Sequence, residues 1–376
     1  MAKTGSTSIQ TFLSDGLTDR RFRYLGFGQT NGSNALCTLF ADHPEQFWCY
    51  RSGQLKARRL THFRAACDQR LRRDLQAARS AGACPILSGE ECWRFSREEL
   101  IRVRERLREE GYAAQIVVYL RPYAQWLESG FQQWVQWEGA CDFSALTAVS
   151  GRGGIGRFNY VGRLQVLADV FGHAQLLARP FTRAALGASG VVSDFCATVG
   201  IDGAGHREPR ANPSLALDAI RVLYALNTHS RRQRPWSLSA TGALVRHLAA
   251  MPGVPLRFCP SLLAPIAGEL EHQHRQLRER FGVDLGEPLA PLAAGEGVAC
   301  EADLLRCSPA ALAWLAASLG EERIAAEPVS SEAVAAWVER RRRRLLRRHG
   351  PALVRERLGQ AWHQQRRRWR WVRRRP

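Results

Sequence analysis

Residues 3–8 have the composition of an anion-binding loop, because a lysine is followed by a glycine and several hydroxyl side chains. The apolar residues Ile9, Phe12, Leu13 and Leu17 come next and fall on one face of a helix. We therefore expect a loop that leads into a helix N-terminus, where unpaired backbone N–H groups and a partial positive charge favour a phosphate. The candidate phosphate ligands are Lys3, Thr4, Gly5, Ser6, Thr7 and Ser8.

Lys3 is chemically distinctive in a chain that uses arginine for almost every cation. The 54 basic residues include two lysines, Lys3 and Lys56. A compact ammonium can follow charge onto a single leaving oxygen, whereas a planar guanidinium is better suited to holding two fixed oxygens. The stretch is not a Walker A motif, in which the lysine follows the second glycine. The alternative interpretation is a solvated lysine near the N-terminus.

A second candidate site follows the apolar run 116–120. Arg121 stands at the carboxyl end of this expected strand, which is the sheet edge where open α/β folds bind ligands. Ser129 comes eight residues later, on the helix expected next, so that a cation and a hydroxyl can reach one phosphate. The alternative is that Arg121 is a surface charge and Ser129 an ordinary helix residue.

Three short apolar runs predict strands that position these residues, at 84–88, 114–120 and 174–178. Each run is followed by a polar turn and a helical segment. This alternation favours an α/β domain with a mostly parallel sheet.

Residues 96–111 predict a helix with recognisable ends. Ser96 can cap its start, and Glu99 stands at the capping-box position three residues later. Gly111 can end it. This helix would then cross over into the buried strand 114–120.

The chain divides into three expected parts. Residues 1–288 form the α/β domain, residues 289–328 a small helical appendage or linker, and residues 329–376 a tail rich in arginine and tryptophan. No run approaches 18 apolar residues, and the N-terminus has no signal-peptide core. The ten scattered cysteines form no C-x-x-C pair, which indicates reduced thiols in the cytoplasm and no zinc site.

The basic character of the chain is a property of its tail. The net charge is +19, of which residues 340–376 contribute +15 through 16 arginines and one glutamate. Arginine with Trp362, Trp369 and Trp371 suits an anionic membrane surface. It also suits nucleic acid, which we consider less favoured. The third interpretation is a solvated extension without a partner.

The ordered set of motifs resembles the bacterial branch of the sulfotransferases. Residues 3–8 resemble the family's 5′-phosphosulfate loop, and the strand–Arg121–x7–Ser129 pattern resembles its 3′-phosphate motif. Further landmarks are the stretches 86–91, 159–172, 177–202 and 211–227. The resemblance implies a P-loop-like three-layer fold, with a central parallel sheet flanked by helices and a helical C-terminal extension. In the family an apolar strand leads into the lysine loop, and here we expect it to be missing, through a late start codon or a truncation.

The resemblance also implies a reaction and roles. The co-substrate would be 3′-phosphoadenosine 5′-phosphosulfate, without a metal, and the sulfuryl group would move in line to a hydroxyl or amine. Lys3 would neutralise the leaving oxygen, residues 4–8 would hold the 5′-phosphate, and Arg121 with Ser129 would hold the 3′-phosphate.

A general base must take the proton of the acceptor. Glu90 is the candidate, since it follows the strand 84–88 at the same sheet edge as Lys3 and Arg121. The alternative is a glutamate in the first turn of a helix. His43 and His62 are fallback bases without a motif. Arg179 can either contact the donor or pair with a carboxylate.

Two functions therefore stay open at this point. One is a cytoplasmic sulfotransferase that acts on a carbohydrate or a related small acceptor, with the tail docking it at the inner face of the membrane. The other is an inactive sulfotransferase-like protein that binds nucleotide, or that binds an anionic membrane or nucleic acid through the tail. Only the enzyme needs the Lys3 loop and Arg121 to face one pocket.

Overall fold

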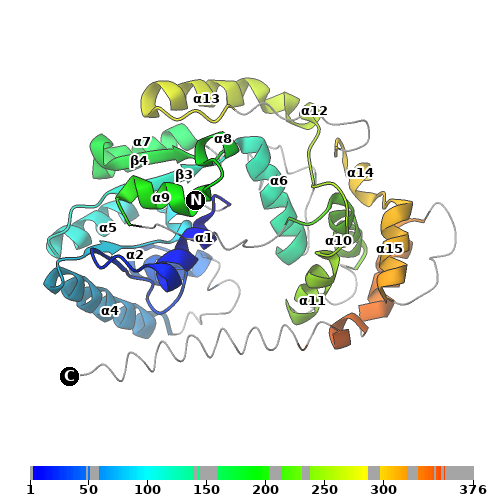
Figure 1. Ribbon diagram of the computed structural model, residues 1–376, viewed down its shortest axis with the longest axis horizontal. Coiled ribbons are helices and arrows are strands. Elements are labelled where there is room, and N and C mark those ends of the chain that lie inside the picture. The colour runs from blue at the N-terminus through cyan, green and yellow to red at the C-terminus, as the bar shows by residue number, and fades with distance from the viewer. Residues whose placement is uncertain are drawn as a thin grey trace.

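The computed structural model describes residues 3–47, 59–138, 159–202, 214–230, 238–286, 297–319 and 329–348 without Arg343, together with Tyr50, Phe143 and Pro351. This part of the chain is a mixed α/β structure, mostly helical, with two small parallel sheets. The α/β class expected from the sequence is therefore confirmed (Figure 1).

The four described strands form two separate parallel pairs. β1 (Phe22–Tyr24) pairs with β2 (Cys84–Ile86), and β3 (Ile116–Leu120) pairs with β4 (Leu176–Pro180). The three runs expected to be strands are thus strands, with bounds shifted by about two residues. The single central sheet that we expected is not formed by the described residues, since no hydrogen-bonded ladder joins β2 to β3.

The expected helix after β2 is present as α5 (Arg97–Glu109), and its start is a capping box. The Ser96 hydroxyl accepts a hydrogen bond from the backbone N–H of Glu99 at 3.1 Å. The Glu99 carboxylate in turn accepts one from the backbone N–H of Ser96 at 2.8 Å. The chain leaves the helix through Gly111, whose φ of +79° is open to glycine at little cost.

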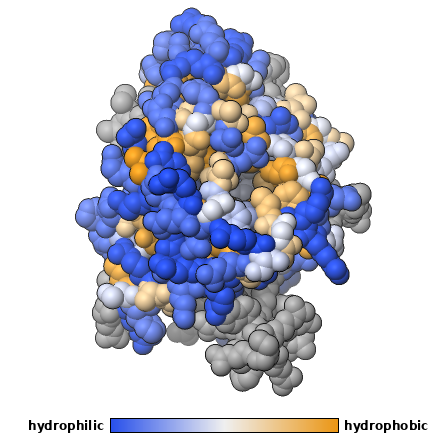
Figure 2. Space-filling view, turned by 90° about the vertical axis from the view of Figure 1, so that its left-hand side faces the viewer, coloured by the Kyte–Doolittle hydropathy of each residue, from blue (hydrophilic) through white to orange (hydrophobic). Residues whose placement is uncertain are grey.

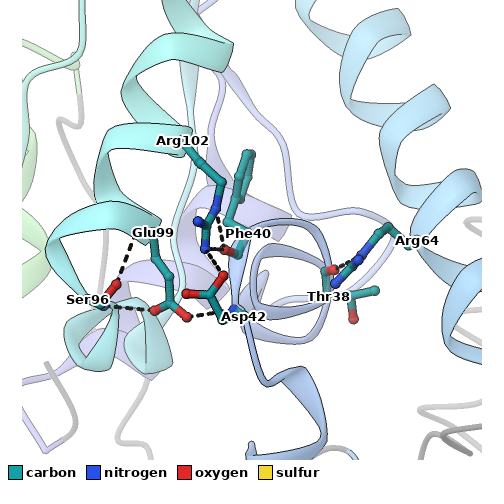
Figure 3. A network of polar contacts seen from close by, with 7 residues as sticks. All are labelled: Thr38, Phe40, Asp42, Arg64, Ser96, Glu99 and Arg102. Atoms are coloured by element: carbon teal, nitrogen blue, oxygen red, sulfur yellow. Dashed lines mark hydrogen bonds and ion pairs between the residues drawn. The ribbon is translucent and has the colours of Figure 1, made fainter.

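Glu99 also joins α5 to α2 (Ser33–Phe40), as Figure 3 shows. Its second carboxylate oxygen accepts a hydrogen bond from the backbone N–H of Asp42 at 2.7 Å. Arg102, one turn further along α5, donates to the carbonyl of Phe40 and to the Asp42 carboxylate. On the other side of α2, Arg64 of α4 (Leu60–Ser80) donates to the carbonyl of Thr38 at 2.7 Å. Arginines of α4 and α5 therefore hold α2 between them through the carbonyls of Thr38 and Phe40, which lie in the last turn of α2, where carbonyl groups lack a partner within the helix.

Helices lie against both faces of the strands. On one face α1 (Ser6–Thr11) and α9 (Gly190–Val199) form an apolar cluster with strand side chains. The other face belongs to the main apolar core, to which α5 and α7 (Tyr160–Phe171) contribute. Successive side chains of β3 point to opposite faces of the sheet. Val117 and Tyr119 therefore belong to the cluster with α1 and α9, while Val118 and Leu120 belong to the main core.

The remaining described helices are α6 (Tyr123–Gln133), α8 (Arg183–Leu186), α10 (Leu217–Ser230), α11 (Leu238–Leu248), α12 (Pro260–Leu263), α13 (Ala267–Phe281), α14 (Glu301–Leu305), α15 (Pro309–Leu319) and a stretch over 331–342. From α10 onward the described chain is mostly helical and continues the main core. In Figure 1, α10, α11, α14 and α15 lie together, away from the strands. Leu304, Leu315, Val334 and Leu345 are buried in the same apolar cluster as Tyr224. Among the described helices, none is long and apolar enough to cross a membrane.

We predict that Glu99→Ala lowers the free energy of unfolding by about 2–4 kcal/mol, since it leaves the backbone N–H groups of Ser96 and Asp42 without their acceptor. The side chain is 7% exposed, so water replaces it poorly. Chemical denaturation measures the change. Glu109→Ala, at an exposed position of the same helix, is the control and should stay within about 0.5 kcal/mol. Equal losses in the two variants would show that the capping network contributes nothing.

Candidate functional site at the Lys3 loop

The Lys3 loop, residues 3–5, is a left-handed turn that starts α1. Lys3 has a φ of +66° and Gly5 a φ of +72°. A Cβ atom on Gly5 would lie 2.6 Å from Cγ1 of Val191 and 3.0 Å from the ring of Phe181. Thr4, between them, is 2% exposed. Glycine is therefore required at position 5, while the left-handed lysine is a strained conformation of the kind that functional sites retain.

Arg121 reaches this loop from the end of β3. Its Nη1 donates a hydrogen bond to the carbonyl oxygen of Lys3 at 3.0 Å. Its guanidinium lies over the ring of Phe181, 5.4 Å from the centroid. The Tyr160 hydroxyl donates to the carbonyl of Arg121 at 2.9 Å and fixes the strand end. The structure thus brings together the lysine loop and the arginine that sequence analysis singled out separately.

Glu90 and Ser88 reach the same place from the end of β2. The Ser6 hydroxyl donates to Oε2 of Glu90 at 3.0 Å, and the Gln10 side-chain amide donates to the Ser88 hydroxyl at 3.1 Å. Glu90 opens the short helical turn Glu90–Arg94, in the position that the alternative interpretation gave it, and it also faces the loop. Glu90 therefore lies in the first turn of a helix and also contacts Ser6 beside the Lys3 loop.

The electrostatics of Lys3 reflect this convergence. Burial lowers its pKa below the ordinary lysine value, the negative charge of Glu90 acts in the opposite direction, and the positive charge of Arg121 lowers the pKa further. Two cations and one carboxylate therefore share a partly dehydrated site. Such a site favours an anion that adds the missing negative charge.

The remaining candidate residues have no described contact with Lys3, Glu90 or Arg121. Thr7 is exposed on α1 and Ser8 is partly buried. Ser129 is partly buried in the second turn of α6, and none of the described hydrogen bonds joins it to Arg121. The fallback bases His43 and His62 are exposed, and none of the described contacts links either to the loop.

Arg179 takes the second of its two expected roles. It forms an ion pair with Asp194 of α9 at 2.5 Å, and the Tyr119 hydroxyl donates to the same carboxylate at 2.6 Å. Arg179 thereby attaches α9 to β3 and β4. Since α9 carries Val191, this ion pair also supports the wall behind Gly5.

Sequence reasoning missed Phe181, Val191 and Gln10. Phe181 covers Arg121, Val191 closes the back of Gly5, and Gln10 holds Ser88. The signal for Phe181 was its place directly after a strand, one residue beyond Pro180. The other two have no local signal, because each acts on a partner more than seventy residues away.

A small cavity of about 60 Å³ lies beside Glu90. It is lined by Asn31, Ser33, Asn34, Cys37, Phe47, Glu90 and Glu91. The lining offers amide, hydroxyl and carboxylate groups next to the candidate base. Within the described residues, no group of three or more His, Cys, Asp or Glu side chains could hold a metal ion.

No family model matches this chain, and no solved structure matches it. An uncharacterized protein from Archaeoglobus fulgidus is 29% identical to it over 144 residues. That match covers 38% of this chain and 38% of the relative, so the chain matches well under half of the relative's length. The comparison assigns neither a family nor an activity.

We predict that Gly5→Ala destabilises the protein by about 2–4 kcal/mol, through left-handed strain and the clash with Val191. Gly200→Ala is the matched control, since Gly200 has a φ of +76° and a Cβ added there would meet nothing within 4 Å. It should cost about 1–2 kcal/mol for the strain alone. Thermal unfolding of both variants measures the difference, and equal shifts would mean that Val191 does not close the loop.

Proposed function

We propose that the protein is a sulfotransferase that uses 3′-phosphoadenosine 5′-phosphosulfate to sulfate a hydroxyl, or an amine, of a carbohydrate or related small acceptor. The observation that carries the proposal is the convergence of three segments. The first segment carries Lys3 of the loop and Ser6 at the start of α1, the second carries Glu90 after β2, and the third carries Arg121 after β3. They meet through the bonds Arg121–Lys3 and Ser6–Glu90. Three chain segments that converge with two cations and a carboxylate suit transfer of an anionic group.

Each candidate residue would have its own role in the reaction. Backbone groups of residues 4–8 would bind the 5′-phosphate, and Arg121 with Ser129 would bind the 3′-phosphate. Glu90 would take the proton from the acceptor as its oxygen, or nitrogen, bonds to sulfur. The bond from sulfur to the bridging oxygen would break, leaving its electron pair on the 5′-phosphate. Lys3 would neutralise that oxygen. No metal takes part in this scheme.

Three features of the fold support the proposal. Helices lie against both faces of the parallel strands, as a P-loop-like three-layer fold requires. Glu90 and Arg121 follow the carboxyl ends of β2 and β3. The cavity beside Glu90 is lined in part by amide, hydroxyl and carboxylate side chains, which are groups that hydrogen-bond to sugar hydroxyls.

The alternative function is an inactive sulfotransferase-like protein that binds nucleotide, or an anionic membrane or nucleic acid. The charge of the tail favours it, although most of residues 340–376 lie outside the described part of the chain. Under the first proposal the tail would place a cytoplasmic enzyme at the inner membrane face. Turnover with the sulfated donor separates the two functions.

We predict that adenosine 3′,5′-bisphosphate binds at least about 100-fold more tightly than adenosine 5′-phosphate, because Arg121 would add a charge-assisted contact to the second phosphate. Isothermal titration calorimetry measures both affinities. Arg121→Gln should remove the preference, with Arg183→Gln on α8 as the control that keeps it. Equal affinities for the two nucleotides in the unmodified protein would refute the assignment of Arg121.

We predict that Lys3→Arg loses most of its turnover, at least about tenfold, while donor affinity changes little. A guanidinium can hold phosphate but fits poorly on a single leaving oxygen. Measurement of kcat tests the loss of turnover, and measurement of donor affinity tests whether donor binding is retained. The control is Lys56→Arg, which changes the second lysine of the chain and should leave both values unchanged. Normal turnover of Lys3→Arg would mean that the ammonium has no special role.

A further inference from the structure

The helical turn Glu90–Arg94, which we call the Glu90 turn, is tied to α2 at its start. The backbone N–H of Gly32 donates to the carbonyl of Ser88 at 2.9 Å, directly ahead of the turn. The backbone N–H of Glu91 donates to the Ser33 hydroxyl at 3.3 Å. The beginning of α2 therefore fixes the place where the turn begins.

Arg163 of α7 holds the end of the Glu90 turn. Its Nη1 donates to the carbonyl of Phe95 at 2.5 Å, and its Nη2 donates to the carbonyl of Cys92 at 3.2 Å. The guanidinium also lies over the Trp93 ring, 5.7 Å from the centroid. A planar guanidinium with several donors can hold two fixed oxygens at once, which an ammonium does less well. Arg163 therefore fixes the backbone that follows Glu90.

Arg163 does not behave as an ordinary surface charge. Figure 2 shows hydrophilic residues over most of the face at the left of Figure 1, with apolar residues recessed between them. Arg163 instead lines a cavity of about 400 Å³, whose walls also include Glu90, Cys92 and Trp93. Burial there lowers the pKa of Arg163 below the ordinary arginine value. A partly dehydrated cation is costly unless its donors are bonded, and the carbonyls of Cys92 and Phe95 supply those bonds.

The same end of α7 also holds Arg121. Tyr160, the first residue of α7, donates its hydroxyl to the carbonyl of Arg121 at 2.9 Å. The rings of Tyr160 and Trp93 meet edge to face, with their centroids 6.2 Å apart. The side chain of Asn159 caps the helix by accepting a hydrogen bond from the backbone N–H of Gly162 at 2.7 Å. The first turn of α7 thus contacts both the strand end after β3 and the Glu90 turn after β2.

We propose that Arg163 is a positioning residue for the candidate base. Its two bonds to the Glu90 turn set the place of Glu90 relative to Arg121, so that both face the Lys3 loop at a fixed separation. A general base must lie within hydrogen-bond distance of the proton that it removes, and a displacement of about 1 Å can cost about 100-fold in rate. The inference rests on the proposed function, since it gives Glu90 the role of base.

The test measures kcat and the KM for the donor, with 3′-phosphoadenosine 5′-phosphosulfate as donor and glucosamine, which offers hydroxyls and an amine, as acceptor. Arg163→Gln removes the guanidinium and should lower kcat by at least about tenfold. The KM for the donor should change by less than about threefold, because the bond from Tyr160 to Arg121 stays in place. Arg163→Lys keeps a cationic donor near the carbonyls and should recover part of the loss.

Arg104→Gln is the matched control. Arg104 of α5 also donates to a backbone carbonyl of α7, that of Val170 at 2.9 Å, but at the other end of the helix. Its loss should leave kcat unchanged, so that a general weakening of the contact between α5 and α7 can be told from displacement of Glu90.

A double-variant cycle shows whether Arg163 acts through Glu90. In a chain that carries Glu90→Gln, the added Arg163→Gln should lower kcat by less than about twofold, since no base is left to displace. A residue that only stabilises the fold would cost the same factor in both backgrounds.

Hydrogen–deuterium exchange tests the hold on the turn without any turnover. The amides of Cys92 and Phe95 donate within the segment that Arg163 contacts. They should exchange at least about tenfold faster in Arg163→Gln than in the unmodified protein, and Arg104→Gln should leave them unchanged.

The outcomes separate this inference from the proposed function. Normal kcat in Arg163→Gln, or an equal loss with and without Glu90→Gln, would overturn the inference and leave the sulfotransferase proposal in place. Unchanged exchange at Cys92 and Phe95 would overturn the inference even without turnover. Faster exchange together with no sulfate transfer by the unmodified protein would count against the proposed function and the role of Glu90 as base, while the hold of Arg163 on the turn would stand.

Discussion

The left-handed turn at Lys3 and Gly5 is the constraint on which the site depends. It sets the residue at which α1 begins, and it directs the Lys3 carbonyl to Arg121 and the Ser6 hydroxyl to Glu90. The turn is possible because position 5 has no Cβ and because Val191 and Phe181 fill the space behind it. Those two residues are held in turn by α9 and by the end of β4, which the Arg179–Asp194 ion pair connects. A backbone conformation of three residues thus relies on contacts from a segment more than 170 residues away.

The site also bridges the two strand pairs. Glu90 belongs to the side of β1 and β2, whereas Arg121 belongs to the side of β3 and β4. Lys3 accepts a hydrogen bond from Arg121, and Ser6, at the start of α1, donates one to Glu90. The distance between the candidate base and the candidate phosphate ligand therefore depends on how the two strand pairs are spaced. Helix α5 links the two pairs in sequence. A cavity of about 400 Å³ is lined by residues of both pairs, 84–90 on one side and 113–119 on the other.

Local patterns in the sequence predicted local structure well. The Ser-x-x-Glu start of α5 and the apolar runs of β2, β3 and β4 are visible without a structure, because capping and strand burial are decided by neighbouring residues. Glu90 and Arg121 could be grouped because each follows a strand of a parallel sheet, whereas the lysine loop was grouped with Arg121 through the resemblance to the sulfotransferases. The separation of the strands into two pairs could not be predicted, since it depends on which edges find partners. Two further contacts could not be predicted, because their partners come from other segments. Glu99 accepts a hydrogen bond from the backbone N–H of Asp42, and Arg179 pairs with the carboxylate of Asp194.

Pro85 has a consequence for the behaviour of the protein in solution. An open strand edge is a template on which another molecule can add a strand, and proteins that expose such edges tend to aggregate. Cys84 and Ile86 use their backbone groups to bond β1, so Pro85 faces the other edge of β2 and has no N–H to donate there. The edge of β3, which has no proline, lines a cavity of about 400 Å³ whose walls include Ile9 of α1 and Phe195 of α9. Neither edge therefore offers a second copy of the chain a continuous, exposed row of hydrogen-bonding groups.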